Sequence, residues 1–206
     1  MNTEVMRADH PVALEHALDV LKNGGLVVFP TDTVYGLAVL PSSEENVERL
    51  FIVKGRNSSK AIAVLVGGVD QLSMVCQDLP PLAVRLGEAF WPGPITLVVW
   101  GHPALPANIS PDHTVGVRMP DHNVALALLR RAGPLAVTSA NLSSRESAIS
   151  AKDVLDQLDG KVHLVLDGGI TPGGVPSTVV NCVGAQPEIL REGPITLDQI
   201  KAALGY

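Results

Sequence analysis

The residues GGLVVFPTDTVYGLAVL, at positions 24–40, contain the end of a helix, two strands and the polar turn between those strands. The two glycines stop the helix, since glycine readily takes the left-handed conformation found at a helix end. The apolar residues 26–29 predict a buried strand, and residues 34–40 predict a second extended segment. The intervening Pro-Thr-Asp-Thr therefore places hydroxyl and carboxylate groups at the end of a strand.

Helices and strands alternate outward from this stretch in both directions. Apolar periodicity predicts helices over residues 12–21, 42–53, 69–76, 81–90, 121–131, 152–158 and from Thr196 onward. Expected helix caps are Ser42 with Glu45, Asp121, and Thr196 with Gln199. Further strands are predicted over residues 61–66, 95–100, 115–119, 135–138, 162–166, 177–183 and 188–190. Because neither a repeat nor a linker interrupts the series, residues 1–206 are expected to form one α/β domain with a mixed sheet.

The composition fits a cytoplasmic protein with a large aliphatic core. The chain is 46% hydrophobic but only 3% aromatic, so aliphatic side chains must fill that core. The formal net charge of −6 makes the chain a poor default partner for nucleic acid or an anionic membrane. Cys76 and Cys182 are too far apart in sequence for a CxxC zinc or redox motif. We expect no signal sequence and no membrane-spanning run, and hence a cytoplasmic location.

Small polar side chains gather where predicted strands end. These clusters are Thr31-Asp32-Thr33, Ser139-Ala140-Asn141 and Ser177-Thr178. Ligands of open α/β sheets bind at such edges, and hydroxyl and amide groups suit a small polar ligand. Ordinary turn and capping chemistry explains any one cluster, whereas three clusters in one short chain favour a binding site.

Positive charges suggest that this ligand carries negative charge. Lys54, Arg56 and Lys60 lie within seven residues that contain no acid. A phosphate site and solvated charges at a helix end explain this cluster equally well. Arg118 interrupts the apolar strand 115–119, so it either pairs with an acid or binds a ligand carboxylate. The same two alternatives apply to Arg191, which follows the predicted strand 188–190. The chain has no P-loop, dinucleotide-binding glycine motif, histidine metal spacing or recognisable catalytic triad.

Eight stretches resemble the motifs of the short, single-domain YrdC-like threonylcarbamoyl-AMP synthases. They occur in the same order as in that family and extend over nearly the whole chain. They are PTDTVYGL (30–37), KGR (54–56), WPGPITLVV (91–99), VGVRMP (115–120), TSAN (138–141), DGG (167–169), PSTVV (176–180) and LREGPI (190–195). The resemblance implies a three-layer fold with a twisted sheet around a basic cavity. It also implies a nucleotidyltransferase that converts L-threonine, bicarbonate and ATP into threonylcarbamoyl-AMP and pyrophosphate. A separate tRNA threonylcarbamoyl-transferase complex would use that product to form threonylcarbamoyladenosine.

The same resemblance implies roles for individual residues. Thr33, Arg118 and Ser177 would bind threonine, with Arg118 holding its carboxylate as a planar fork. The positions that would bind ATP are Arg56, Lys60, Thr114, Ser139, Ser147 and Arg191. The catalytic positions, beside the reacting phosphates, are Lys54, Arg56, Ser139 and Asn141, and Mg²⁺ would lie on the pyrophosphate. Since the threonine amine and the carbamate oxygen are the nucleophiles, no protein nucleophile or protein metal site is implied.

Three features depart from the family pattern. Lys60, Ala61 and Leu65 replace the usual Asn, Pro and His that follow the KGR stretch. Leu65 cannot donate the hydrogen bond of that histidine, so we expect a changed affinity or selectivity for threonine. Lys60 adds a cation near the nucleotide, and no further C-terminal domain is expected after Tyr206.

Two other functions fit parts of this pattern. A double-stranded RNA-binding module without turnover would use the basic cavity, but the net charge of −6 and the scarcity of aromatics argue against more than weak RNA binding. A carbamoyl-transfer domain of the hydrogenase-maturation type shares the expected fold, yet such proteins carry zinc-finger cysteines and further domains. The carbamate-adenylating enzyme is therefore the favoured prediction.

Overall fold

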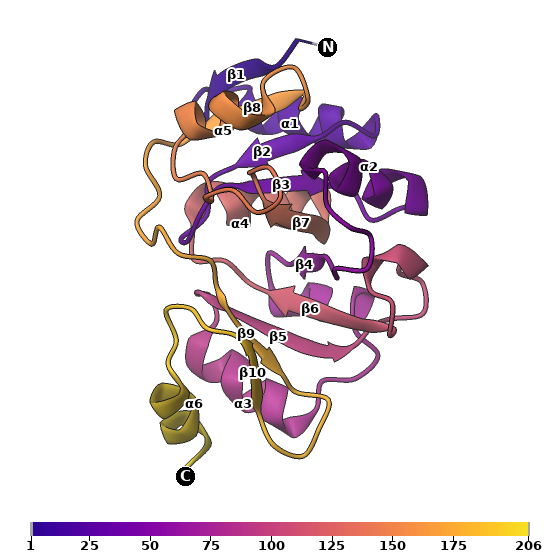
Figure 1. The fold of residues 1–206 in the computed structure, drawn as a ribbon, viewed down its shortest axis with the longest axis vertical. Helices are drawn as coiled ribbons and strands as arrows, with labels where there is room; N and C mark the ends of the chain where they lie inside the picture. The colour runs from indigo at the N-terminus through magenta and orange to yellow at the C-terminus, as the bar shows by residue number, and fades with distance from the viewer. Residues whose placement is uncertain (1, 206) are drawn as a thin grey trace.

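The computed structural model describes residues 2–205, which build a mixed sheet of ten strands. The strands follow the order β1-β8-β2-β3-β7-β4-β6-β5-β9-β10 across the sheet, with both parallel and antiparallel neighbours. Figure 1 shows this sheet running from β1 near the N-terminus to β9 and β10 near the C-terminus. The strand bounds are β1 Glu4–Arg7, β2 Val27–Phe29, β3 Gly36–Val39, β4 Ala63–Leu65, β5 Ile95–Trp100, β6 Thr114–Arg118, β7 Leu135–Ser139, β8 Leu164–Asp167, β9 Thr178–Asn181 and β10 Glu188–Arg191.

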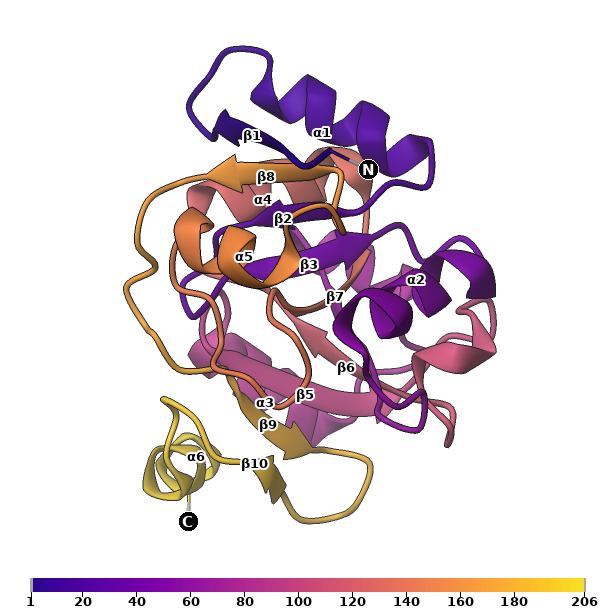
Figure 2. The ribbon, with the colours of Figure 1, turned by 45° about the horizontal axis from the view of Figure 1, so that its top comes forward.

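Helices cover the sheet from both sides, which confirms the predicted layered α/β fold. The helices α1 and α4 contact each other over one apolar core, and α2, α3, α5 and α6 contribute to the other. In Figure 2, α5 lies in front of the upper strands and α4 behind them. Helix bounds are α1 Ala13–Lys22, α2 Glu44–Lys54, α3 Pro81–Phe90, α4 Asn123–Ala132, α5 Ala151–Leu158 and α6 Leu197–Leu204, with 3-10 turns η1 Val69–Met74 and η2 Ala107–Ile109. No helix in the described residues is long and apolar enough to cross a membrane.

The apolar strand runs of the sequence reflect burial on both faces of the sheet. Successive side chains of a strand point to opposite faces. Val27 and Phe29 accordingly pack with α1 and α4, while Val28 between them packs into the other core. All three are fully buried, which is why this strand has no polar alternation.

The same register leaves one part of the sheet uncovered. Ala63 of β4 lies opposite Val137 of β7 and Gly116 of β6, and Gly116 lies opposite Val98 of β5. These residues share the face that α1 and α4 cover farther along the sheet. Between β7 and β9 this face lines a cavity instead, and the candidate site lies there.

The structure corrects several local predictions. Ser43, not Ser42, caps α2, because its hydroxyl accepts the Asn46 N–H, whereas Glu45 pairs with Arg49. Asp121 does not cap α4, whose first residue follows His122 without any side-chain cap. The predicted helix over residues 69–76 is the 3-10 turn η1, and strand β1 was not predicted at all. The capping box of Thr196 with Gln199 is confirmed.

Candidate active site

A cavity of about 660 Å³ lies on the uncovered face of the sheet, between β7 and the β9–β10 hairpin. Polar and apolar side chains of β4, β5, β6, β7 and β9 form its floor, and the turn after β2 closes one side. The structure brings together seven of the eleven residues to which the family resemblance assigns a binding or catalytic role. Those that line the cavity are Thr33, Arg56, Thr114, Arg118, Ser139, Ser177 and Arg191.

Arg118, the last residue of β6, is the most deeply buried charge of the cavity, with 6% of its surface exposed. Its Nε donates to the carbonyl of Gly93 (3.0 Å), its Nη1 to Thr33 Oγ1 (2.9 Å) and its Nη2 to Asp32 Oδ1 (2.5 Å). The sequence left open whether Arg118 pairs with an acid, and the ion pair with Asp32 answers this. A guanidinium has five N–H groups. One N–H on each Nη therefore has no partner among the described residues, and such a pair can bind a carboxylate.

The turn after β2 orients the hydroxyl of Thr33. Thr31 Oγ1 donates to the carbonyl of Val34 at 2.6 Å, so its single proton is already used. In the 3.0 Å contact between the two hydroxyls, Thr33 is therefore the donor and Thr31 the acceptor. Arg118 donates to the same Thr33 oxygen, which leaves one lone pair for a ligand N–H or O–H group.

A second hydroxyl cluster faces this turn from β5 and the start of β9. Ser177 Oγ lies 2.8 Å from Thr96 Oγ1 and accepts Nη2 of Arg191 at 3.0 Å. Arg191 also donates through Nε and Nη2 to the Ser177 carbonyl, at 3.0 and 2.7 Å. The sequence analysis missed Thr96, which is only 4% exposed. A hydroxyl side chain within the apolar run of β5 was a usable signal, because a buried hydroxyl needs a hydrogen-bond partner.

Three arginines converge on the cavity. Burial lowers the pKa of Arg56, and burial followed by the charge of Arg56 lowers the pKa of Arg191. Burial also lowers the pKa of Arg118, with Arg191 adding to the effect against the opposing influence of Asp32. Arginine remains protonated despite such shifts. In the described residues only one acid, Asp112, lines the cavity, so its arginine-rich side is suited to anions.

Arg56 has spare hydrogen-bonding capacity. Its Nη1 donates to Thr138 Oγ1 at 3.2 Å and its Nη2 to the carbonyl of Ala61 at 2.8 Å. Its Nε is buried and has no partner in the part of the chain that the structure describes. A cation positioned beside Thr138 and Ser139 in this way can bind a phosphate.

Lys54 is buried behind the cavity wall and does not line the cavity. Its Nζ donates to the carbonyls of Ser139 and Asn141, both at 2.5 Å. Burial, followed by the charge of Arg56, lowers its pKa to about 7. The side-chain amide of Asn141 in turn donates to the carbonyls of Leu142 and Arg145, at 2.8 Å each. Both side chains thus fix the turn that presents Ser139 to the cavity.

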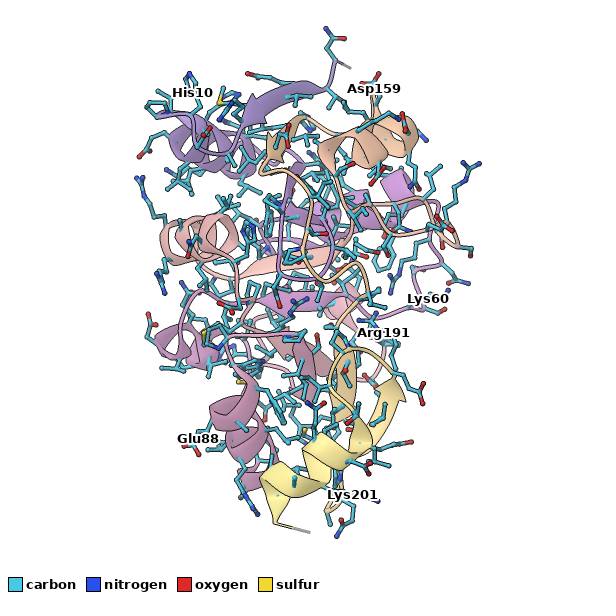
Figure 3. The ribbon with its side chains drawn as sticks, turned by 90° about the vertical axis from the view of Figure 1, so that its left-hand side faces the viewer. His10, Lys60, Glu88, Asp159, Arg191 and Lys201 are labelled. Carbon is cyan, nitrogen blue, oxygen red and sulfur yellow. The ribbon has the colours of Figure 1, made fainter. Side chains whose placement is uncertain are left out.

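Two predicted nucleotide positions lie apart from the cavity lining. Lys60 is exposed in the loop after α2, and Figure 3 shows it on the same side of the molecule as Arg191. Ser147 lines a separate hollow of about 500 Å³ together with Glu146, Asp153 and Asp156. No group of three or more His, Cys, Asp or Glu side chains within residues 2–205 has the arrangement of a metal site.

The chain is similar in sequence to one protein family over most of its length. The Sua5/YciO/YrdC family model, described as "Telomere recombination", matches residues 19–193. The threonylcarbamoyl-AMP synthase of Bacillus subtilis is 39% identical over 198 residues, covering 93% of this chain and 56% of that protein. A putative threonylcarbamoyl-AMP synthase of Mycobacterium tuberculosis is 40% identical, covering 92% of this chain and 88% of that protein.

A solved structure extends the similarity to three dimensions. The crystal structure of Pyrococcus abyssi Sua5 complexed with L-threonine superposes with a TM-score of 0.92 at 35% identity. The match covers 99% of this chain and 60% of the archaeal one. This chain thus spans little more than half the length of its Bacillus relative and of the threonine-bound Sua5.

Proposed function

Because the chain belongs to the Sua5/YciO/YrdC family, we propose that it makes threonylcarbamoyl-AMP from L-threonine, bicarbonate and ATP. Similarity to proteins named threonylcarbamoyl-AMP synthase supports the reaction. The observation that carries it is the buried guanidinium of Arg118, which keeps two N–H groups without a partner among residues 2–205, beside the hydroxyls of Thr33 and Ser177. This combination matches an amino acid that bears a carboxylate, an amine and a hydroxyl.

Threonine would bind with its carboxylate on the free N–H groups of Arg118. Asp32 keeps the guanidinium plane fixed, so the fork is organised before the ligand arrives. The free lone pair of Thr33 would accept from the threonine amine, and Ser177 would contact the threonine hydroxyl. Leu65 lies opposite Arg118 in the paired strands β4 and β6 and forms an apolar wall of this part of the cavity.

The nucleotide would place its phosphates near Arg56, Ser139 and Arg191. The threonine amine first attacks the carbon of bicarbonate, and loss of water gives the carbamate. A carbamate oxygen then attacks the α-phosphorus of ATP, and the bond to pyrophosphate breaks. The arginines would offset the negative charge that develops at phosphorus, while the cavity aligns the two reactants.

Mg²⁺ would enter with the nucleotide. The cavity offers hydroxyls, arginines and one carboxylate, Asp112, whose Oδ1 already accepts from Ser110 and Thr114. This donor set fits an ion held by phosphate oxygens rather than by side chains, and the ion would offset charge on the leaving pyrophosphate. Lys54 and Asn141 would act through the turn at Ser139, and Lys60 would add positive charge at the cavity mouth.

Purified protein incubated with ATP, bicarbonate and threonine tests this proposal directly. We expect pyrophosphate and threonylcarbamoyl-AMP in equal amounts, and neither when threonine is omitted. Arg56→Ala should lower the rate of both products together. Pyrophosphate without threonylcarbamoyl-AMP, or no product at all from folded protein, would contradict the proposal. Transfer of the product to tRNA by a separate transferase is the expected next step, and adding such an enzyme with tRNA would test it.

A further inference from the structure

Ser177 forms a buried hydroxyl pair with Thr96, a residue of β5 to which the proposed reaction gives no role. The two oxygens, Thr96 Oγ1 and Ser177 Oγ, lie 2.8 Å apart, and each residue is only 4% exposed. Both side chains nevertheless line the cavity. Figure 1 shows β9, which begins one residue after Ser177, beside β5. The pair is therefore a fixed feature of the cavity wall.

The hydroxyl pair lies at the amino-acid end of the cavity. Leu97 of β5 pairs with Val117 of β6, so the adjacent residues Thr96 and Arg118 both point to the opposite, cavity face of the sheet. Such facing positions of an antiparallel ladder have Cβ atoms roughly 5 Å apart. Because Arg118 is the proposed partner of the ligand carboxylate, Thr96 lies within reach of the side chain of the same amino acid.

The neighbouring strand fixes the direction of the Thr96 hydroxyl. Gly116 of β6 leaves open the space that the Thr96 methyl group occupies, since a Cβ at position 116 would lie 3.0 Å from Thr96 Cγ2. A β-branched side chain is also stiff about its χ1 torsion. With its methyl group packed over Gly116, Thr96 directs its hydroxyl to Ser177.

The protons of this pair leave one donor and one acceptor for a ligand. Each hydroxyl carries one proton and two lone pairs. Within residues 2–205, Thr96 Oγ1 bonds to Ser177 Oγ, which also accepts from Nη2 of Arg191. If Thr96 donates to Ser177, the proton of Ser177 and the lone pairs of Thr96 are free. If Ser177 donates instead, the proton of Thr96 and one lone pair of Ser177 are free.

In both arrangements, one hydroxyl of the pair donates into the cavity and the other accepts from it. A ligand hydroxyl satisfies both, because it accepts one hydrogen bond and donates another, so the three hydroxyls close a ring. A methyl or methylene group in the same place leaves both protein groups without partners, which is costly in a buried site. The charged donor Arg191 polarises Ser177 and so strengthens the ring.

We propose that Thr96 and Ser177 together clamp the side-chain hydroxyl of the bound amino acid, which makes Thr96 a specificity-determining residue. The inference rests on the proposed use of threonine. It assigns to these two hydroxyls the selection of a hydroxylated amino acid over one of similar size without a hydroxyl. Arg118 binds the carboxylate that all amino acids share, and the clamp distinguishes their side chains.

Thr96→Val tests the clamp, because valine keeps the shape of threonine and lacks its hydroxyl. L-α-Aminobutyrate is the matched ligand, since it carries a hydrogen where threonine carries its hydroxyl. In calorimetry, wild type should bind threonine roughly tenfold or more tightly than α-aminobutyrate. Thr96→Val should bind threonine roughly five- to hundredfold more weakly than wild type does, with the affinity for α-aminobutyrate unchanged. Thr96→Ser keeps the hydroxyl and should retain most of the preference for threonine.

Thr178→Val is the control for the loss of a buried threonine hydroxyl. Thr178 is fully buried beside Ser177, and its hydroxyl donates to the carbonyl of Ile195 at 2.8 Å instead of facing the cavity. This variant should be less stable in urea unfolding and should keep the wild-type preference for threonine. An unchanged preference in folded Thr96→Val, or an equal loss of preference in Thr178→Val, would overturn the clamp.

Turnover in the same preparations separates this inference from the proposed function. If wild type makes threonylcarbamoyl-AMP while Thr96→Val keeps the preference for threonine, the clamp fails and the proposed function stands. If wild type makes no threonylcarbamoyl-AMP but binds threonine with a preference that Thr96→Val loses, the proposed function fails and the clamp stands.

Discussion

Arg118 and Asp32 form an ion pair within the cavity wall, with Arg118 Nη2 2.5 Å from Asp32 Oδ1. The two side chains are 7% and 11% exposed, so water screens the pair little. Oδ1 of Asp32 also accepts the Asp121 N–H at 3.1 Å, and Oδ2 is buried without a partner in the described chain. Asp32 therefore both neutralises Arg118 and fixes the plane in which the guanidinium meets a ligand.

Asp32→Asn should test this positioning role. The amide oxygen still accepts from Arg118 but carries no charge, so the arginine becomes a buried cation without a counter-ion. We expect the free energy of unfolding to fall by roughly 1–3 kcal/mol, less than the ~3–5 kcal/mol of deleting one partner of a buried pair. The KM for threonine should rise more than the KM for ATP. Urea unfolding and steady-state kinetics measure both effects.

Asp9→Asn is the matched control, because Asp9 pairs with Arg7 at the exposed surface. It should change neither unfolding nor kinetics. If Asp32→Asn behaves like this control, the buried pair does not position Arg118.

Arg118→Lys should separate charge from geometry at the amino-acid site. Lysine keeps the positive charge but loses the planar fork that holds a carboxylate through two hydrogen bonds. We expect the KM for threonine to rise by roughly ten- to hundredfold, since a charge-assisted hydrogen bond contributes about 1.5–3 kcal/mol. Arg131→Lys, at a surface arginine that pairs with Glu15, should leave both substrates unaffected. An equal rise in the KM for ATP would show that Arg118 does not act selectively on threonine.

The burial of Lys54 should make stability depend on pH. Its folded-state pKa of about 7 lies below the roughly 10.4 of an unfolded lysine. Between these values the unfolded state holds a proton that the folded state has released, so raising the pH favours folding. Relative to Lys54→Met, wild type should gain about 1 kcal/mol of unfolding free energy per pH unit between pH ~7 and ~9.

Denaturant titrations at several pH values measure this slope. Lys60→Met, which alters an exposed lysine of the neighbouring loop, is the control and should follow wild type. Parallel stability curves for wild type and Lys54→Met would mean that Lys54 keeps its proton in the folded protein across this range.

Local patterns of the sequence predicted every strand except β1, and they predicted the charged positions, but not the partners of those charges. Arg118 stood out because it interrupts an apolar strand, whereas Asp32 lies 86 residues away and only the folded sheet brings the two together. Lys54 was grouped with Arg56 because they are neighbours in sequence. The structure directs Lys54 instead to carbonyls 85 and 87 residues away, because the turn after β7 lies against the end of α2. Side-chain direction at such a junction depends on tertiary packing, which spacing does not contain.

The start of α2 offers a stability test of another sequence prediction. Ser43 accepts the Asn46 N–H and so satisfies one of the free donors of the first turn. Ser43→Ala should therefore lower the free energy of unfolding by about 1 kcal/mol. Ser42→Ala removes only an exposed contact to the Asn46 side chain and should have little effect. Equal effects of the two substitutions in thermal unfolding would contradict the assignment of Ser43 as the cap.

Leu65 offers a sharp test of amino-acid binding, because it lies opposite Arg118 in the paired strands and lines the cavity while only 4% exposed. An apolar side chain there contributes shape but no hydrogen bond to the ligand. Leu65→His adds a donor next to the proposed carboxylate and hydroxyl contacts. Threonine and serine both carry these groups, so we expect kcat/KM to rise for both amino acids by roughly three- to tenfold, the effect of about one hydrogen bond.

The same change buries a polar ring against apolar neighbours, so it should lower the free energy of unfolding by roughly 1–3 kcal/mol. Leu65→Met keeps the volume and the apolar character and should change neither stability nor kcat/KM. Steady-state assays with each amino acid, read as kcat/KM, distinguish the two variants. If Leu65→His leaves kcat/KM for threonine at the wild-type value while the protein remains folded, the side chain at this position does not contact the bound amino acid.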